Sequence, residues 1–157
     1  RGYAVTAFDG SAESLRRLRA AAAEVEIEGS LEVRQGDMTA LPFESEFRGV
    51  VCLGNSFGYG PLPEFRAFLG GVARALQPGG RFLMHTAVAA ECLLPGLAPE
   101  EEMRIGDVQV AFENRYDPLA GRLDTRFVLS RGGERFDRLT SHFVFTLRPL
   151  AEMPSIH

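Results

Sequence analysis

The first half of this 157-residue chain alternates short apolar segments with segments of helical periodicity. This alternation restricts the possible folds more than any other feature of the sequence. The expected strands are 3–8, 31–34, 49–53 and 81–85. A helix is expected after Ser11, and a second over 65–76, which the Gln-Pro-Gly-Gly of 77–80 should end. Strand–helix–strand units form parallel sheets with right-handed crossovers. The sequence therefore predicts an α/β fold with a doubly wound parallel sheet, in which the very apolar third strand is buried on both faces.

The second half of the chain follows a different pattern. After about residue 106, apolar and polar residues alternate, and turn signals at 117–121 and 131–133 divide this part into three expected antiparallel strands. Their shared apolar face is expected to contain Val110, Phe112, Phe127, Phe143 and Phe145. The predicted domains are a core at 1–86, an insert at 87–147 and the start of a truncated helix or tail at 148–157.

Composition and charge argue against several classes of function. The chain has 17 basic and 21 acidic residues, a net charge of −4 that disfavours general nucleic-acid binding and a polybasic membrane patch. No apolar run approaches the length that a membrane span needs. The histidines and the two cysteines, Cys52 and Cys92, are too scattered to suggest a metal site. Reduced thiols fit a cytoplasmic protein better than a disulfide scaffold.

Two acids follow expected strands of the parallel sheet, where such folds bind ligands. Asp9 is placed to accept hydrogen bonds from a ribose diol, or to cap the next helix. Asp37 is placed to accept from an exocyclic amine with Met38 against a ring face, or to form a turn with Gly36. Both alternatives stay open. Because the two strands are expected to be parallel, the two carboxyl groups should lie at the same edge of one sheet and flank a cleft.

The loop after the third strand combines an amide, a hydroxyl and two aromatic rings, in Asn55, Ser56, Phe57 and Tyr59. Polar groups with aromatic walls suit a small-molecule pocket, but such aromatics can also fill the core. His85 closes the fourth strand as either a core histidine or a general base. Arg115 and Tyr116 end a strand of the insert, as exposed hairpin residues or as a lid.

Four segments resemble, in order, motifs of class I S-adenosylmethionine-dependent methyltransferases. Residues 2–11 resemble the second motif, a strand that ends in an acid, and 35–43, with Gln-Gly-Asp-Met and Leu-Pro-Phe, resemble the third. Residues 47–53 resemble the fourth strand, with Arg48 where the family often has an acid. Residues 76–83 are similar to the family's Leu-x-Pro-Gly-Gly turn into strand five.

The resemblance implies methyl transfer from S-adenosylmethionine to a small-molecule acceptor, within a Rossmann-like sheet. It implies that the cofactor is bound by Asp9, Gly10, Ser11, Asp37, Met38 and Asn55. It implies substrate binding by Ser56, Phe57, Tyr59, Arg115 and Tyr116, with His85 and Tyr59 as catalytic candidates. The antiparallel insert, with Asn-Arg-Tyr-Asp at 114–117, resembles the substrate-side insert of small-molecule methyltransferases.

Parts of the family pattern have no counterpart here: the glycine-rich loop, the strand before it, and the last two strands. We therefore expect an interior fragment whose Rossmann-like sheet is incomplete and lacks strand one. Segments 3–8 and 49–53 would flank that strand and should not pair directly. The apolar face of the insert should cover the acceptor pocket, pair with a second subunit in a homodimer, or do both. The alternatives are an NAD(P)-dependent oxidoreductase and a non-catalytic interaction module.

Overall fold

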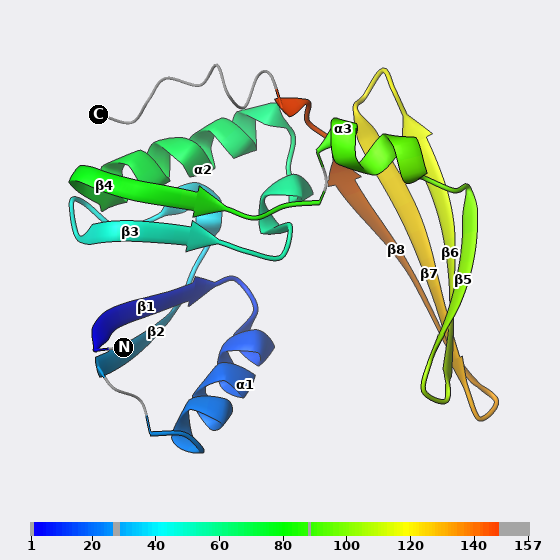
Figure 1. Ribbon diagram of the computed structural model, residues 1–157, viewed down its shortest axis with the longest axis horizontal. Helices are drawn as coiled ribbons and strands as arrows, with labels where there is room; N and C mark the ends of the chain where they lie inside the picture. The colour runs from blue at the N-terminus through cyan, green and yellow to red at the C-terminus, as the bar shows by residue number, and fades with distance from the viewer. Residues whose placement is uncertain (1, 27–28, 88, 148–157) are drawn as a thin grey trace. The chain divides into compact units, whose positions relative to one another are not determined.

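The structure is a computed structural model that describes residues 2–26, 29–87 and 89–147, so the expected helix or tail at 148–157 lies outside the described residues. The chain divides into two compact units, shown as ribbons in Figure 1. The first contains Arg1–Val50 and Arg66–Arg81, and the second contains Val51–Phe65 and Phe82–His157. Each unit is described by itself.

The first unit opens with a parallel strand–helix–strand motif. Strand β1 (Tyr3–Asp9) pairs with β2 (Gly29–Gln35) in parallel, with Asp9 opposite Gln35. Helix α1 (Ala12–Ala23) connects the two strands, and its N-cap is Ser11, whose side chain accepts from the Ser14 amide. The motif and its helix start are as the sequence predicts.

A second pair of strands follows the short 3-10 turn η1 (Met38–Ala40). Strand β3 (Phe47–Cys52), helix α2 (Leu62–Ala75) and strand β4 (Leu76–Met84) succeed one another, and β3 pairs with β4 running in the same direction (Figure 1). In the first unit the Phe43 ring is buried against Phe8 and Phe47, at centroid distances of 5.4 and 5.0 Å.

Two expectations about these strands are wrong. The Gln-Pro-Gly-Gly segment at 77–80 was expected to separate helix from strand, but β4 already begins at Leu76 and includes it. Strand β3 is not buried on both faces, since Val51 is 58% exposed. A third expectation is confirmed: among the described residues β1 and β3 do not pair, because β1–β2 and β3–β4 form separate sheets.

The second unit contains the antiparallel sheet and the short elements that precede it. These are η2 (Ser56–Tyr59), α3 (Ala90–Leu93), η3 (Leu94–Gly96), β5 (Glu100–Ile105), β6 (Val108–Asp117), β7 (Arg122–Arg131) and β8 (Glu134–Phe143). The strand order is β5–β6–β7–β8, so the expected three-stranded insert in fact has four strands. Strand β5 has no alternation of apolar and polar residues, and its partner β6 fixes it in the sheet.

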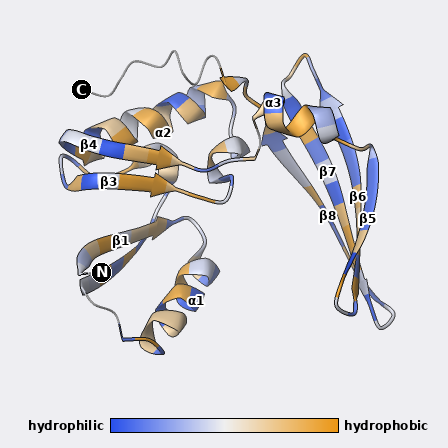
Figure 2. Cartoon of the chain, in the orientation of Figure 1, coloured by the Kyte–Doolittle hydropathy of each residue, from blue (hydrophilic) through white to orange (hydrophobic). Residues whose placement is uncertain are grey.

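The register separates the sheet into two faces, and hydrophilic and hydrophobic residues both occur along its strands (Figure 2). Phe112 lies opposite Phe127, and their rings meet at a centroid distance of 5.2 Å, so they share a face as predicted. Phe143 lies opposite Arg122, on the other face, because even-numbered residues of β8 are the ones level with Phe127. Phe145 lies beyond β8 and stacks on Phe65. The expectation that Phe143 and Phe145 join the apolar face is therefore wrong.

Candidate functional site

The two acids of the first unit lie at the same edge of one sheet. Asp9 is the last residue of β1, and Asp37 follows β2 by two residues. Since β1 and β2 are parallel and in register, both strands present their carboxyl ends at this edge. The loop after β1 also meets the end of β2, because the Gln35 side-chain amide donates to the Gly10 carbonyl at 3.1 Å. The predicted position of Asp9 and Asp37 at one sheet edge is confirmed, and the cleft that they are expected to flank stays a prediction.

Asp9 organises the turn into α1 without capping it. Its Oδ1 accepts from the Ser11 amide at 2.7 Å, whereas the cap itself is the Ser11 hydroxyl. Within the described part of the chain, the second carboxylate oxygen of Asp9 accepts no hydrogen bond. The helix-cap interpretation of Asp9 is therefore wrong, and one exposed oxygen faces solvent at the strand end.

Asp37 is held more firmly. Its Oδ1 accepts from both the amide and the hydroxyl of Thr39, each at 2.8 Å, which makes it the N-cap of η1. These hydrogen bonds lower the pKa of the Asp37 carboxyl, so it is ionised at neutral pH. Gly36 allows this tight turn, because a Cβ atom there would lie 2.3 Å from the Phe8 ring. The turn interpretation of Asp37 is correct, and among the described residues no hydrogen bond to its Oδ2 is found.

Three further predicted residues follow strands β3 and β4 in the second unit. Asn55 has a left-handed backbone (φ 64°), and its Oδ1 accepts from the Ala87 amide at 2.6 Å. Ser56 donates its hydroxyl to the Leu53 carbonyl at 3.1 Å. The His85 amide donates to the Cys52 carbonyl at 2.9 Å while its side chain is exposed, so the core-histidine interpretation is wrong. Asn55 thus ties the two strand ends together.

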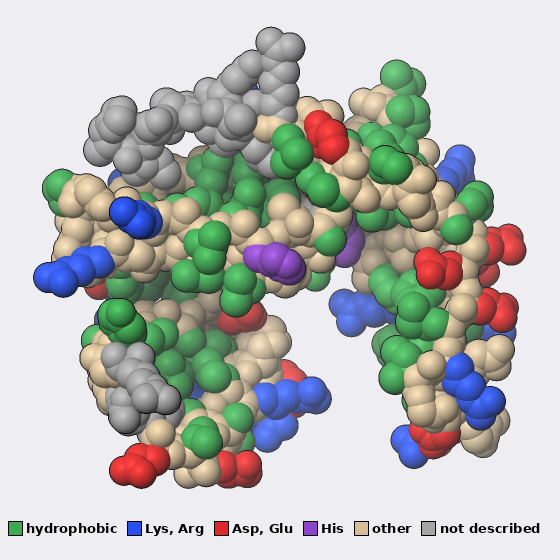
Figure 3. All heavy atoms as spheres, viewed as in Figure 1, with side chains coloured by type: hydrophobic (Ala, Val, Ile, Leu, Met, Phe, Trp, Pro, Cys, Tyr) green, Lys and Arg blue, Asp and Glu red, His purple; other side chains and the backbone are tan. Residues whose placement is uncertain are grey.

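The aromatic residues of the η2 loop divide between core and surface. Phe57 is 3% exposed and packs on Phe65 and Phe145, at centroid distances of 5.2 and 5.8 Å, which supports the core interpretation over substrate contact. Tyr59 is 62% exposed, and its ring lies 4.7 Å from that of His142. Histidine side chains are visible at the surface in Figure 3.

His142 is a candidate that sequence reasoning missed. In the register of the sheet, Tyr116, Leu123 and His142 form one row, so His142 shares a face with Tyr116. Burial lowers the pKa of the His142 imidazole, which is therefore neutral near pH 7. Arg115 is opposite Asp124, so Arg115 and Tyr116 lie on opposite faces of the sheet. The row of Tyr116, Leu123 and His142 could not be predicted from the sequence, because it depends on which residues of the three strands pair.

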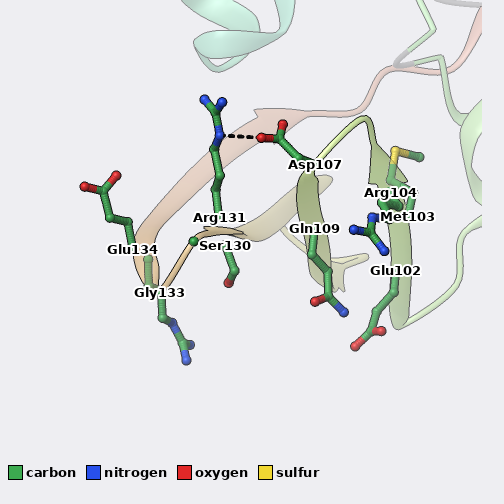
Figure 4. A pocket seen from close by; sticks show the side chains of 11 residues that line it. Glu102, Met103, Arg104, Asp107, Gln109, Ser130, Arg131, Gly133 and Glu134 are labelled. Atoms are coloured by element: carbon green, nitrogen blue, oxygen red, sulfur yellow. Dashed lines mark hydrogen bonds and ion pairs between the residues drawn. The ribbon is translucent and has the colours of Figure 1, made fainter.

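A charged hollow lies at the end of the antiparallel sheet that carries the turns after β5 and β7 (Figure 4). It measures about 750 Å³, and its charged lining includes Arg104, Asp107, Arg131 and Arg135. Arg131 and Asp107 pair across it at 2.7 Å. No predicted site residue lines it, and its mixed charges favour no ligand class. Among the described residues there is no cluster of potential metal ligands, and no helix is long and apolar enough to cross a membrane.

Among families of known proteins, the family described as a methyltransferase domain matches residues 1–80 of this chain. This stretch holds β1, β2 and β3, both acids and the η2 loop. A search of curated proteins gave no match.

Three solved structures of similar fold are each longer than this chain. A S-adenosylmethionine-dependent methyltransferase from Clostridium acetobutylicum has a TM-score of 0.75 and 16% identity, over 96% of this chain and 61% of its own. The CcbJ methyltransferase from Streptomyces caelestis has a TM-score of 0.80 and 19% identity, over 95% and 61%. CalS10, an amino pentose methyltransferase from Micromonospora echinaspora, has a TM-score of 0.69 and 19% identity, over 94% and 62%. The chain thus spans about 61% of the first two.

Proposed function

The chain belongs to the methyltransferase domain family, and from this premise we propose that its protein transfers a methyl group from S-adenosylmethionine to a small-molecule acceptor. The sequence motifs resemble those of the class I S-adenosylmethionine-dependent methyltransferases, and the family match confirms this membership. S-adenosylmethionine is accordingly the cofactor. The observation that carries the proposal is the pair of acids, Asp9 and Asp37, at one edge of a parallel sheet.

The residues at this edge fit the adenosine part of the cofactor. Asp9 keeps one carboxylate oxygen to accept from a ribose hydroxyl while the other holds the turn. Asp37 is ionised and fixed by Thr39, with Oδ2 to accept from the adenine amine and Met38 beside it to border the ring. Gly10 and Ser11 complete the loop. When bound, the cofactor supplies a methyl group already activated by its sulfonium.

The second unit supplies the residues proposed for the acceptor side. Asn55 would lie near the methionine part, and Ser56, Tyr59 and Tyr116 would bind the acceptor. In-line attack on an activated methyl needs orientation more than acid–base help, and effective-molarity arguments allow about 7–11 kcal/mol from it. The neutral imidazole of His142 or the exposed His85 would take a proton from the acceptor. Since one similar structure is an amino pentose methyltransferase, an amino sugar is the first acceptor class to test.

The family match favours methyl transfer over the two alternatives, a nicotinamide-dependent oxidoreductase and a non-catalytic module. Calorimetric titration of the full-length protein with S-adenosylhomocysteine and with NAD separates all three. Methyl transfer predicts saturable binding of S-adenosylhomocysteine and none of NAD. The reverse preference would support the oxidoreductase, and binding of neither would leave the interaction module.

A further inference from the structure

One face of the antiparallel sheet has an apolar centre, and its rows of side chains run across to both edge strands. The register places the following residues level with one another in two adjacent rows of this face. The rows are Met103–Val110–Leu129–Phe136 and Glu101–Phe112–Phe127–Arg138. We name this surface the aromatic face. Each row crosses all four strands, from β5 to β8.

Much of the aromatic face is open to solvent. Ile105, which belongs to it through its partner Val108, is 64% exposed, Phe136 is 55% exposed and Met103 is 42% exposed. Hydrophobic side chains are visible along this sheet in Figure 3. A sheet that exposes large apolar side chains and two edge strands risks uncontrolled association unless a specific partner covers it.

Ion pairs satisfy some of the charges on both faces of the sheet. On the opposite face Arg126 pairs with Asp137 and Glu113, and Arg122 with Asp124. On the aromatic face Arg131 pairs with Asp107. On the aromatic face, Glu101 and Arg138 stand at opposite ends of one row, three strand spacings or about 14 Å apart. Neither forms an ion pair with any described residue. Because two phenylalanines separate them, these charges cannot pair within one copy of the sheet.

We propose that the aromatic face binds the same face of a second copy of this chain, related by a two-fold axis close to the strand direction. Such an axis reverses the order of the strands and keeps each row at its level. Glu101 of one copy then faces Arg138 of the other, twice, and Phe112 faces Phe127 between them. The arrangement is an aligned sheet-on-sheet packing with a self-complementary interface.

The test uses matched variants of strand β8 in the full-length protein, measured by sedimentation equilibrium. Phe136 and Leu139 are both exposed, at 55% and 67%, and lie on opposite faces. The wild type should be a dimer. Phe136→Glu should weaken the dimer by more than about tenfold, because each 1.4 kcal/mol lost is a factor of ten and a buried unpaired charge costs more. Leu139→Glu should leave the dimer unchanged.

A charge exchange tests the orientation of the two copies. Arg138→Glu alone and Glu101→Arg alone should each weaken the dimer, and the double variant should restore it. Arg135→Glu, on the same strand but the opposite face, should have no effect. A wild type that stays monomeric, with the aromatic face covered by another part of its own chain, would overturn the proposal. A dimer sensitive to Leu139→Glu and not to Phe136→Glu, or one that the double variant fails to restore, would also overturn it.

Discussion

At the scale of single residues, substitutions of Asp9 distinguish a structural role of its carboxylate from a cofactor-binding role. Asp9→Asn keeps an oxygen that can accept from the Ser11 amide but removes the charge, whereas Asp9→Ala removes both. If Asp9 binds the ribose hydroxyls, both variants should weaken S-adenosylhomocysteine binding, the alanine by about 1–3 kcal/mol. Calorimetry measures the loss. Glu13→Gln, on the exposed face of α1, is the control, and unchanged affinity in Asp9→Asn would assign Asp9 to the turn alone.

His142 gives the protein a pH dependence of known sign. Burial lowers the pKa of its imidazole in the folded state, so the unfolded chain binds more protons between the two pKa values. Stability should therefore fall as the pH drops from about 6.5 towards the folded pKa. In urea denaturation, His142→Gln should show a smaller loss than the wild type between pH 7.5 and 5.5. An equal loss in both proteins would show that His142 does not cause it.

Residue positions were predicted best where they depend on location along a strand. The strand-end locations of Asp9, Asp37, Asn55 and His85 follow from local pattern, and the structure has them there. The split between buried Phe57 and exposed Tyr59 does not, because both belong to one short loop and tertiary packing decides which ring fills the core. His142 was missed because only the pairing of β7 with β8 brings it level with Tyr116.

At the scale of elements, the start of α1 is fixed by one side chain. The Ser11 hydroxyl accepts from the Ser14 amide at 3.2 Å. Ser11→Ala should lower the free energy of unfolding by about 1 kcal/mol, the usual effect of losing an N-cap. Ser14→Ala makes the same chemical change inside the first turn and should be neutral or slightly stabilising, since alanine favours helices. Equal destabilisation by both substitutions, measured by denaturant titration, would exclude the cap as the cause.

Strands were missed in the sequence where only hydrogen bonds to a neighbouring strand hold them in a sheet. Strand β5 reads Glu-Glu-Glu-Met-Arg-Ile, which has no strand signal of its own, and hydrogen bonds to β6 hold it in the sheet. The beginning of β4 contains a proline and two glycines, which locally indicate a turn. The helices α1 and α2 were predictable because their apolar periodicity is a local signal, and α1 also has the Ser11 cap.

At the scale of the whole molecule, family membership and fold agree on an α/β methyltransferase core followed by an antiparallel sheet. The chain spans about 61% of the first two similar structures, and Val5 and Val51 remain 51% and 58% exposed on β1 and β3. The expectation that a further strand lies between β1 and β3 stays a prediction.

Cofactor binding at the sheet edge with Asp9 and Asp37 is tested most directly by hydrogen–deuterium exchange of the full-length protein with and without saturating S-adenosylhomocysteine. Binding there predicts slower exchange at the amides of 10–12 and 38–40, which follow β1 and β2. The turn at 131–133, beside the charged hollow, should not change and serves as an internal control. Bound ligand with no slowing at 10–12 and 38–40 would contradict the central claim that this sheet edge holds the cofactor.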